Sequence, residues 1–179
     1  ACNGTVLWSW EMTGFGRFNV PRDSGNWCAT ADAVFLVVDD HCWKLSALTG
    51  EVLARIPVTD HQAESRAWGY VAAVGDSLFG SELPRGTSWD DFWGDATAGW
   101  YDARSGEVTY PVCSDRIFSR DAASGELNWE YQRGVVLNST ITVADGTMYF
   151  VESRSESVLQ SEHRRVGDPD LWNSLYLVA

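Results

Sequence analysis

Short apolar runs separated by Gly- or Asp-containing turns follow one another along most of the chain, and their order repeats. One half of the repeated unit is a glycine turn leading into an apolar run, at residues 4–8, 50–53 and 125–129. The other half is an Asp turn leading into a second run, at residues 32–36, 76–79 and 145–150. The first two glycines lie 46 residues apart and the first two Asp turns 44 apart. In an all-strand chain, this period predicts β-propeller blades of four strands each.

The runs predict where the strands lie. We expect a short strand over 4–10, two strands over 26–38 hinged at Asp32, and strands over 41–46 and 51–57, which together contain one complete blade. Further strands are expected over 67–74, 78–83 and 114–125, followed by a third unit over 139–151 and a last strand over 174–179. The pairs Thr49-Gly50 and Ser124-Gly125 supply the positive φ that a tight strand-to-strand turn needs.

Two insertions interrupt the repeat. Gly50 and Gly125 lie 75 residues apart, so we expect an inserted loop at about 84–112, with a hairpin of its own near Ser105-Gly106. A second, polar insertion is expected at about 152–170, and a helical pattern competes only weakly, at 88–93. We therefore interpret residues 1–179 as part of a single propeller domain with fewer than three blades, whose remaining blades belong to a longer parent protein.

Composition narrows the function classes. With 45% hydrophobic and 13% aromatic residues, the chain has enough apolar surface for a core. The net charge of −12 and the scattered 13 basic residues argue against nucleic-acid binding, which needs clustered Lys and Arg. No apolar run approaches 18 residues, so no membrane-spanning segment is expected.

Two segments resemble the quinoprotein-type, or PQQ-like, β-propeller repeat, in which a strand leads into an Ala-rich turn ending in Thr-Gly or Ser-Gly and then into a strand ending in Trp. They are Lys44-Leu45-Ser46-Ala47-Leu48-Thr49-Gly50-Glu51-Val52-Leu53 and Phe118-Ser119-Arg120-Asp121-Ala122-Ala123-Ser124-Gly125-Glu126-Leu127-Asn128-Trp129. Residues 141–150 are similar to the inner hairpin of such a blade. Trp8 and Trp129 stand at the same phase after their glycines, as apolar wedges between blades would, whereas Ala54 departs from this rule.

The resemblance implies a fold and leaves two functions open. Some proteins with this repeat are quinone-dependent dehydrogenases, which hold PQQ and Ca²⁺ and commonly carry a vicinal Cys pair. Others are non-catalytic scaffolds. This chain has no adjacent cysteines, so the resemblance favours a scaffold without cofactor from an exported bacterial protein, periplasmic or in the cell envelope. Part of a PQQ-dependent dehydrogenase is the alternative.

The four cysteines are Cys2, Cys28, Cys42 and Cys113. None has CxxC or CxxCH spacing, so neither zinc nor haem is expected. Buried free thiols are the favoured interpretation, because Cys packs as a small hydrophobe. A disulfide, with Cys28 joined to Cys42, is the alternative if the parent is exported.

The first insertion contains the strongest candidates for ligand or partner contacts. Its acidic residues Asp90, Asp91, Asp95 and Asp102 are weak candidates for Ca²⁺ ligands, since they lack the spacing of a preorganised calcium loop. Its aromatic residues Trp89, Phe92, Trp93 and Trp100 are candidates for a protein-interaction surface, although an ordered loop packed by its own aromatic rings is the simpler interpretation.

Asp39, Asp40 and His41 stand together between two predicted strands. They have the residue types of a metal or acid–base site, but a polar hairpin turn explains them equally well. No Ser-His-Asp spacing, phosphate-binding glycine loop or His-Glu-x-x-His motif occurs. No catalytic residue is therefore predicted, and we expect protein partners to contact the inserted loops.

Overall fold

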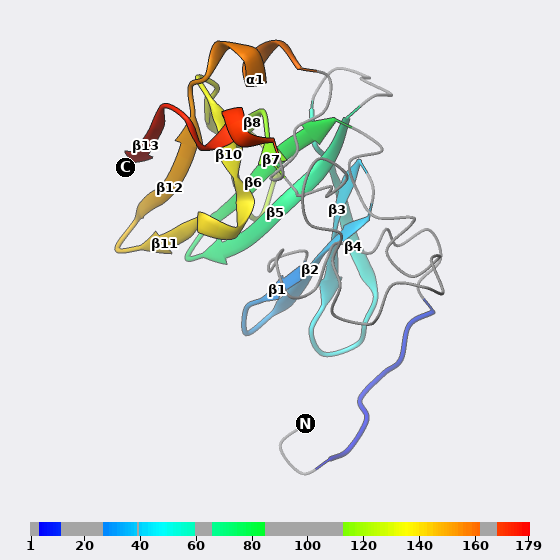
Figure 1. Ribbon diagram of the computed structural model, residues 1–179. Coiled ribbons are helices and arrows are strands. Elements are labelled where there is room, and N and C mark those ends of the chain that lie inside the picture. Colours follow the sequence, from blue (N-terminus) through cyan, green and yellow to red (C-terminus); the bar gives the residue numbers. More distant parts are fainter. Residues whose placement is uncertain (1–3, 12–26, 39, 60–65, 85–112, 162–167) are drawn as a thin grey trace.

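The computed structural model describes residues 4–11, 27–38, 40–59, 66–84, 113–161 and 168–179, which form three antiparallel sheets and little helix (Figure 1). The first sheet pairs β1 (Trp27–Ala29), β2 (Ala33–Val38), β3 (His41–Ser46) and β4 (Val52–Pro57) in chain order. This is the complete blade that the sequence predicts, with its strand bounds matched to within one residue, apart from the unassigned turn at Asp32. The all-β fold of four-stranded blades is confirmed.

The second blade pairs β5 (Arg66–Val74), β6 (Ser77–Pro84), β8 (Arg116–Asp121) and β9 (Leu127–Tyr131). The third sheet contains β10 (Val135–Leu137), β11 (Thr142–Ala144) and β12 (Thr147–Ser153), together with β13 (Leu175–Val178). A 3₁₀ turn, η1 (Asn138–Thr140), separates β10 from β11, and both pair with the same edge of β12 while β13 pairs with the other. The short β7 (Cys113–Ser114) extends this sheet beside β10.

The local structure differs from the prediction at three places. Residues 4–10 contain none of the strands assigned in the described part of the chain, although a strand is expected there. The sequence analysis missed β10, a strand of only three residues. The second insertion begins two residues later than expected, since β12 continues to Ser153, and it contains a short helix, α1 (Glu156–Gln160), and a 3₁₀ turn, η2 (Pro169–Trp172).

The turn that carries the family resemblance has the same hydrogen bonds in both complete blades. The amide of Gly50 donates to the carbonyl of Ser46, and the amide of Gly125 donates to that of Asp121, each over 2.8 Å. Gly50 and Gly125 have φ of +73° and +79°, a conformation in which a side chain is strained. The glycines of the repeated phrase are therefore required by the turn itself.

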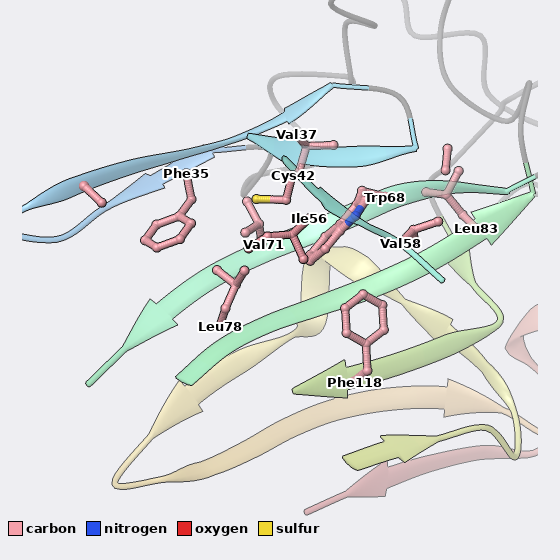
Figure 2. Packing of buried hydrophobic residues seen from close by; sticks show 12 residues of the cluster. Phe35, Val37, Cys42, Ile56, Val58, Trp68, Val71, Leu78, Leu83 and Phe118 are labelled. Carbon is pink, nitrogen blue, oxygen red and sulfur yellow. The ribbon is translucent and has the colours of Figure 1, made fainter. Parts of the chain in front are cut away.

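Side chains of neighbouring blades interlock to form the core. One cluster fills the space between the first and second blades, with Phe35, Val37 and Ile56 facing Trp68, Val71, Leu78 and Phe118 (Figure 2). A second cluster joins Phe79 and Ile117 of the second blade to Val136, Met148 and Phe150 of the third sheet. Adjacent residues of β6 and β8 thus point into different clusters, and the second blade is buried on both faces.

Candidate functional site

Trp8 docks on the first blade although residues 4–11 form no strand. Its indole Nε1 donates a 3.0 Å hydrogen bond to the carbonyl of Ala47, in the turn before β4. A Cβ at Gly50 would lie 2.6 Å from the Trp8 ring, so only glycine allows the ring to lie flat on this turn. Trp10 continues the contact, with its ring 5.0 Å from that of Trp43. Trp8 therefore packs on the first blade, and its predicted role as a wedge between two blades stays a prediction.

The same place on the second blade is filled by different residues. Ala122 is the counterpart of Ala47, and its carbonyl accepts a 2.8 Å hydrogen bond from Lys44 Nζ. A Cβ at Gly125 would lie 3.3 Å from Ile56. Lys44 and Ile56 together thus fill the place of the Trp that the repeat would have at Ala54. The turn before the fourth strand is contacted at the same position in both blades, but by different side chains.

Charged side chains also join the first two blades. Arg116 donates to the carbonyl of Val58 over 3.0 Å, to Glu82, and to Glu130 over 2.5 Å. Arg66 pairs with Glu82 and Asp115 at 3.4 and 2.7 Å. Carboxylates and guanidinium groups on neighbouring strands of the second blade therefore neutralise one another, and Arg116 connects them to the first blade.

A buried polar cluster lies where the second blade meets the third sheet. Ser114 Oγ is 2.6 Å from Asn138 Oδ1 and 2.8 Å from Ser81 Oγ, which in turn accepts the amide of Tyr70 over 2.7 Å. A Cβ at Gly69 would lie 2.5 Å from Ser81 Oγ, so glycine is required there. The cluster has hydroxyls but no general base, and its geometry suits holding the sheets in register.

A second buried polar group is Glu152 on β12, which is fully buried. Its Oε1 accepts hydrogen bonds from Tyr131 Oη over 2.9 Å and from Arg154 Nε over 2.6 Å. Burial, followed by the hydrogen bond to Glu152, raises the pKa of Tyr131. The guanidinium of Arg154 lies 4.0 Å from the Tyr176 ring centroid, so this cluster connects β9, β12 and β13.

Sequence reasoning missed these buried polar groups for a common reason. Glu152 was assigned to an exposed polar insertion, and Ser81, Ser114 and Asn138 follow no motif. Ser81, Ser114 and Asn138 meet only because β6 of the second blade packs beside the third sheet, in which β7 pairs with β10.

The described cysteines form no disulfide. Cys42 and Cys113 are buried, as the favoured interpretation predicts, whereas Cys28 is half-buried. Cys28 on β1 and Cys42 on β3 are separated by the whole of β2. Strands two positions apart are about 9.5 Å from one another, beyond the Cα separation of a disulfide, so the proposed Cys28–Cys42 bridge is wrong. Burial raises the pKa of the Cys28 thiol to about 11 and that of Cys42 further. Cys2 lies outside the described residues.

The structure describes only part of the predicted sites. Asp40 lies in the turn between β2 and β3, and His41 is the first residue of β3. Asp40 Oδ1 contacts His41 Nδ1 at 2.7 Å and both residues are half-buried, which agrees with the interpretation of a polar turn. Asp39 lies outside the described residues, as do Asp90, Asp91, Asp95, Asp102, Trp89, Phe92, Trp93, Trp100 and the hairpin at 105–106. Within the described ranges, no three His, Cys, Asp or Glu side chains are grouped as metal ligands would be.

The second insertion is anchored to the third sheet. Val158 of α1 and Leu171 of η2 are buried against Cys113, Val135 and Leu137. The same two short elements leave Leu159 38% and Trp172 50% exposed. The insertion is therefore held by its own apolar residues and presents two more on the surface.

Comparisons with known proteins add little to this geometry. The sequence matches no protein-family model and no curated protein. Among solved structures, a europium-containing methanol dehydrogenase is similar, with 13% sequence identity and a TM-score of 0.35 over 83% of this chain. The chain spans about two fifths (41%) of the length of that protein. No helix in the described ranges has the length and apolar character needed to cross a membrane.

Proposed function

We propose that the chain is a non-catalytic interaction scaffold built from propeller blades, as part of a larger exported bacterial protein. The observation that carries the proposal is the anchored insertion, in which Val158 and Leu171 hold α1 and η2 in place while Leu159 and Trp172 face outward. Exposed apolar side chains on a firmly held surface are typical of protein-docking sites, where Trp is enriched.

The use of polar side chains supports the same proposal. Lys44 and Arg116 donate to main-chain carbonyls of a neighbouring blade, and the carboxylate of Glu152 accepts from Tyr131 and Arg154. All of these contacts except that of Arg154 with Glu152 join two strands or blades. The charged and carboxylate side chains of the blades thus stabilise the scaffold. We propose that its loops contact partners.

The alternative, part of a quinone-dependent oxidoreductase, requires residues for PQQ and Ca²⁺. The described residues do not supply such a set, since Ca²⁺ needs six to eight oxygen ligands and the described acidic side chains form no group of three. We therefore derive no step through that cofactor.

Two measurements separate these functions. Substituting Trp172→Ser in the full-length parent protein is expected to abolish cross-linking to its physiological partner, whereas Leu48→Ser, at a residue 73% exposed in the turn before β4, leaves it intact. Titration of the parent with PQQ and millimolar Ca²⁺ is expected to give no saturable heat and no dye reduction with alcohols or sugars. Saturable binding with turnover contradicts the scaffold proposal and assigns the parent to the dehydrogenases.

A further inference from the structure

The second strands of the second blade and of the third sheet each carry a carboxylate at the same position. β6 begins at Ser77 and β12 at Thr147, and Glu82 and Glu152 stand five residues after these positions. Both carboxylates are buried, and each is paired with arginine. The same place in the repeat can therefore be compared in two surroundings.

In the second blade, the charges at this place balance within the strands β5, β6 and β8. Arg66 and Arg116 pair with Glu82, and Arg66 also pairs with Asp115. Two guanidinium groups thus meet two carboxylates before Glu130 of β9 adds a third. This network has no surplus of positive charge.

In the third sheet, the arginine of the first strand is replaced by glycine. The register that pairs Val136 with Glu152 places Gly134, two residues earlier, opposite Arg154, which is the position of Arg66 in the second blade. A Cβ at Gly134 would lie 2.8 Å from Glu152 Cδ, so only glycine allows the carboxylate to lie against the main chain here. Glu152 is thereby covered, with Arg154 as its charged partner.

Arg154 is held in a fixed orientation. Its Nε donates to Glu152 over 2.6 Å, and its guanidinium lies 4.0 Å from the Tyr176 ring centroid. Hydrogen bonds to Glu152 and then to Tyr131 raise the pKa of Arg154. A guanidinium has five N–H donors in a planar fork, so these two acceptors leave further donors for a ligand. The side chain is 36% exposed, which allows a ligand to approach it.

Arg133 adds a second positive charge. It directly precedes Gly134, so its main chain lies beside that of Arg154, and its exposed guanidinium is 6.0 Å from the Tyr131 ring centroid. Within the described ranges, Arg133 forms no salt bridge. The charged side chains that contact Tyr131 or Glu152 are therefore two arginines and one carboxylate. In a chain of net charge −12, this place has a local surplus of positive charge, which attracts anions.

We infer that Arg154 and Arg133 bind an oxyanion, that is, a carboxylate or phosphate group of a ligand. The planar fork of arginine pairs with such groups through two parallel hydrogen bonds. The inference goes beyond the proposed scaffold function, because the two surfaces differ. Arg154 contacts Tyr131 and so lies where the third sheet meets the second blade, whereas α1 and η2 pack on the other face of that sheet.

Isothermal titration calorimetry of the 179-residue chain tests the inference, with inorganic phosphate and acetate as probes at constant ionic strength. At least one probe is expected to bind with a dissociation constant of about 1 mM. Arg133→Gln removes one charge and is expected to weaken binding at least about fivefold. Arg55→Gln is the matched control, since Arg55 is also exposed and its guanidinium lies 4.1 Å from the Trp43 ring centroid. It is expected to leave the affinity unchanged.

A second variant tests the planar fork. Arg154→Lys keeps a positive charge beside Glu152 but loses the fork, and is expected to weaken binding at least about fivefold. Urea unfolding of each variant shows that it is folded. An unchanged affinity in Arg154→Lys overturns the assignment of Arg154 as a ligand-binding residue.

Two further results overturn the inference. One is the absence of saturable heat up to about 20 mM of either probe. The other is an equal loss of affinity in Arg133→Gln and Arg55→Gln, which indicates unspecific attraction of anions. When binding is found, the probe that binds more tightly identifies the group that a natural ligand carries.

The readout is independent of the proposed function. Trp172→Ser is expected to leave the affinity for the probes unchanged, because η2 packs on the other face of the third sheet. Failure of partner binding therefore does not imply failure of anion binding, and the reverse also holds.

Discussion

At the residue scale, two glycines with the same backbone conformation have different neighbours. Gly50 and Gly75 have φ of +73° and +59°, but a Cβ at Gly75 would meet nothing within 4 Å while one at Gly50 would meet the Trp8 ring. The left-handed backbone penalises alanine at both positions, and only at Gly50 does the side chain also displace a docked residue.

We therefore expect Gly75→Ala to lower the free energy of unfolding by about 1 kcal/mol and Gly50→Ala by about 2–3 kcal/mol. Urea denaturation measures both values. Acrylamide quenching of Trp fluorescence in the folded state is expected to rise only in Gly50→Ala, as Trp8 leaves the turn. Equal losses at the two glycines would show that the Trp8 contact is energetically unimportant.

The buried thiol of Cys28 makes stability depend on pH. Its pKa is about 11 in the folded chain against an ordinary value of 9.0, so above pH 9 the unfolded chain holds fewer protons than the folded chain. Stability is then complete below pH 9 and falls as the pH rises towards 11. Denaturation midpoints at pH 8 and pH 10.5 are expected to differ more in the wild type than in Cys28→Ser. An identical pH dependence in both would contradict the assignment of this effect to Cys28.

At the element scale, the stability of β12 depends most on the contacts of Glu152 with neighbouring residues. The carboxylate is fully buried, and Arg154, one residue after β12, is its partly exposed charged partner at 2.6 Å. Removing Arg154 leaves the buried carboxylate without a charged partner, whereas neutralising both side chains does not.

Arg154→Met is expected to destabilise the chain, and the double variant Glu152→Gln with Arg154→Met is expected to recover more than half of that loss. Equilibrium urea unfolding of the wild type, both single variants and the double variant completes the cycle. Strictly additive losses would show that the two side chains do not interact.

At the scale of the whole molecule, the second blade couples the two cores. Leu78 is fully buried against the first blade, and Ile117 is buried against the third sheet. Because β6 and β8 supply residues to both clusters, neither cluster can be lost while the second blade stays folded.

We expect Leu78→Ala and Ile117→Ala each to cost about 2–5 kcal/mol and to shift a single unfolding transition. The transition is to be followed by both Trp fluorescence and far-ultraviolet circular dichroism. Two separate transitions in Ile117→Ala, with the first blade unfolding later, would show that the blades are independent units.

The features that sequence predicted correctly are those decided by near neighbours in the chain. Alternating apolar residues decide the bounds of β2, β3 and β13. Hydrogen bonds between residues within about five positions of one another form the turns at Gly50 and Gly125. The period of the repeat then predicts the order of strands in the first two blades, because consecutive strands in such a chain pair with one another.

Contacts between distant segments were decided only by tertiary structure. Ile56 and Lys44 contact a turn more than 65 residues away in sequence. Any hydrogen-bond donor and any apolar side chain at those positions can make the same contacts, so no motif marks them. Glu152 looks like a surface residue in the sequence, and is buried because β9, β12 and β13 close around it. The lack of an assigned strand at residues 4–10 likewise depends on tertiary contacts, which no local pattern encodes. The blades and their turns could thus be predicted from the repeat in the sequence. The contacts between blades could not, because burial and pairing between blades depend on residues far apart in the chain.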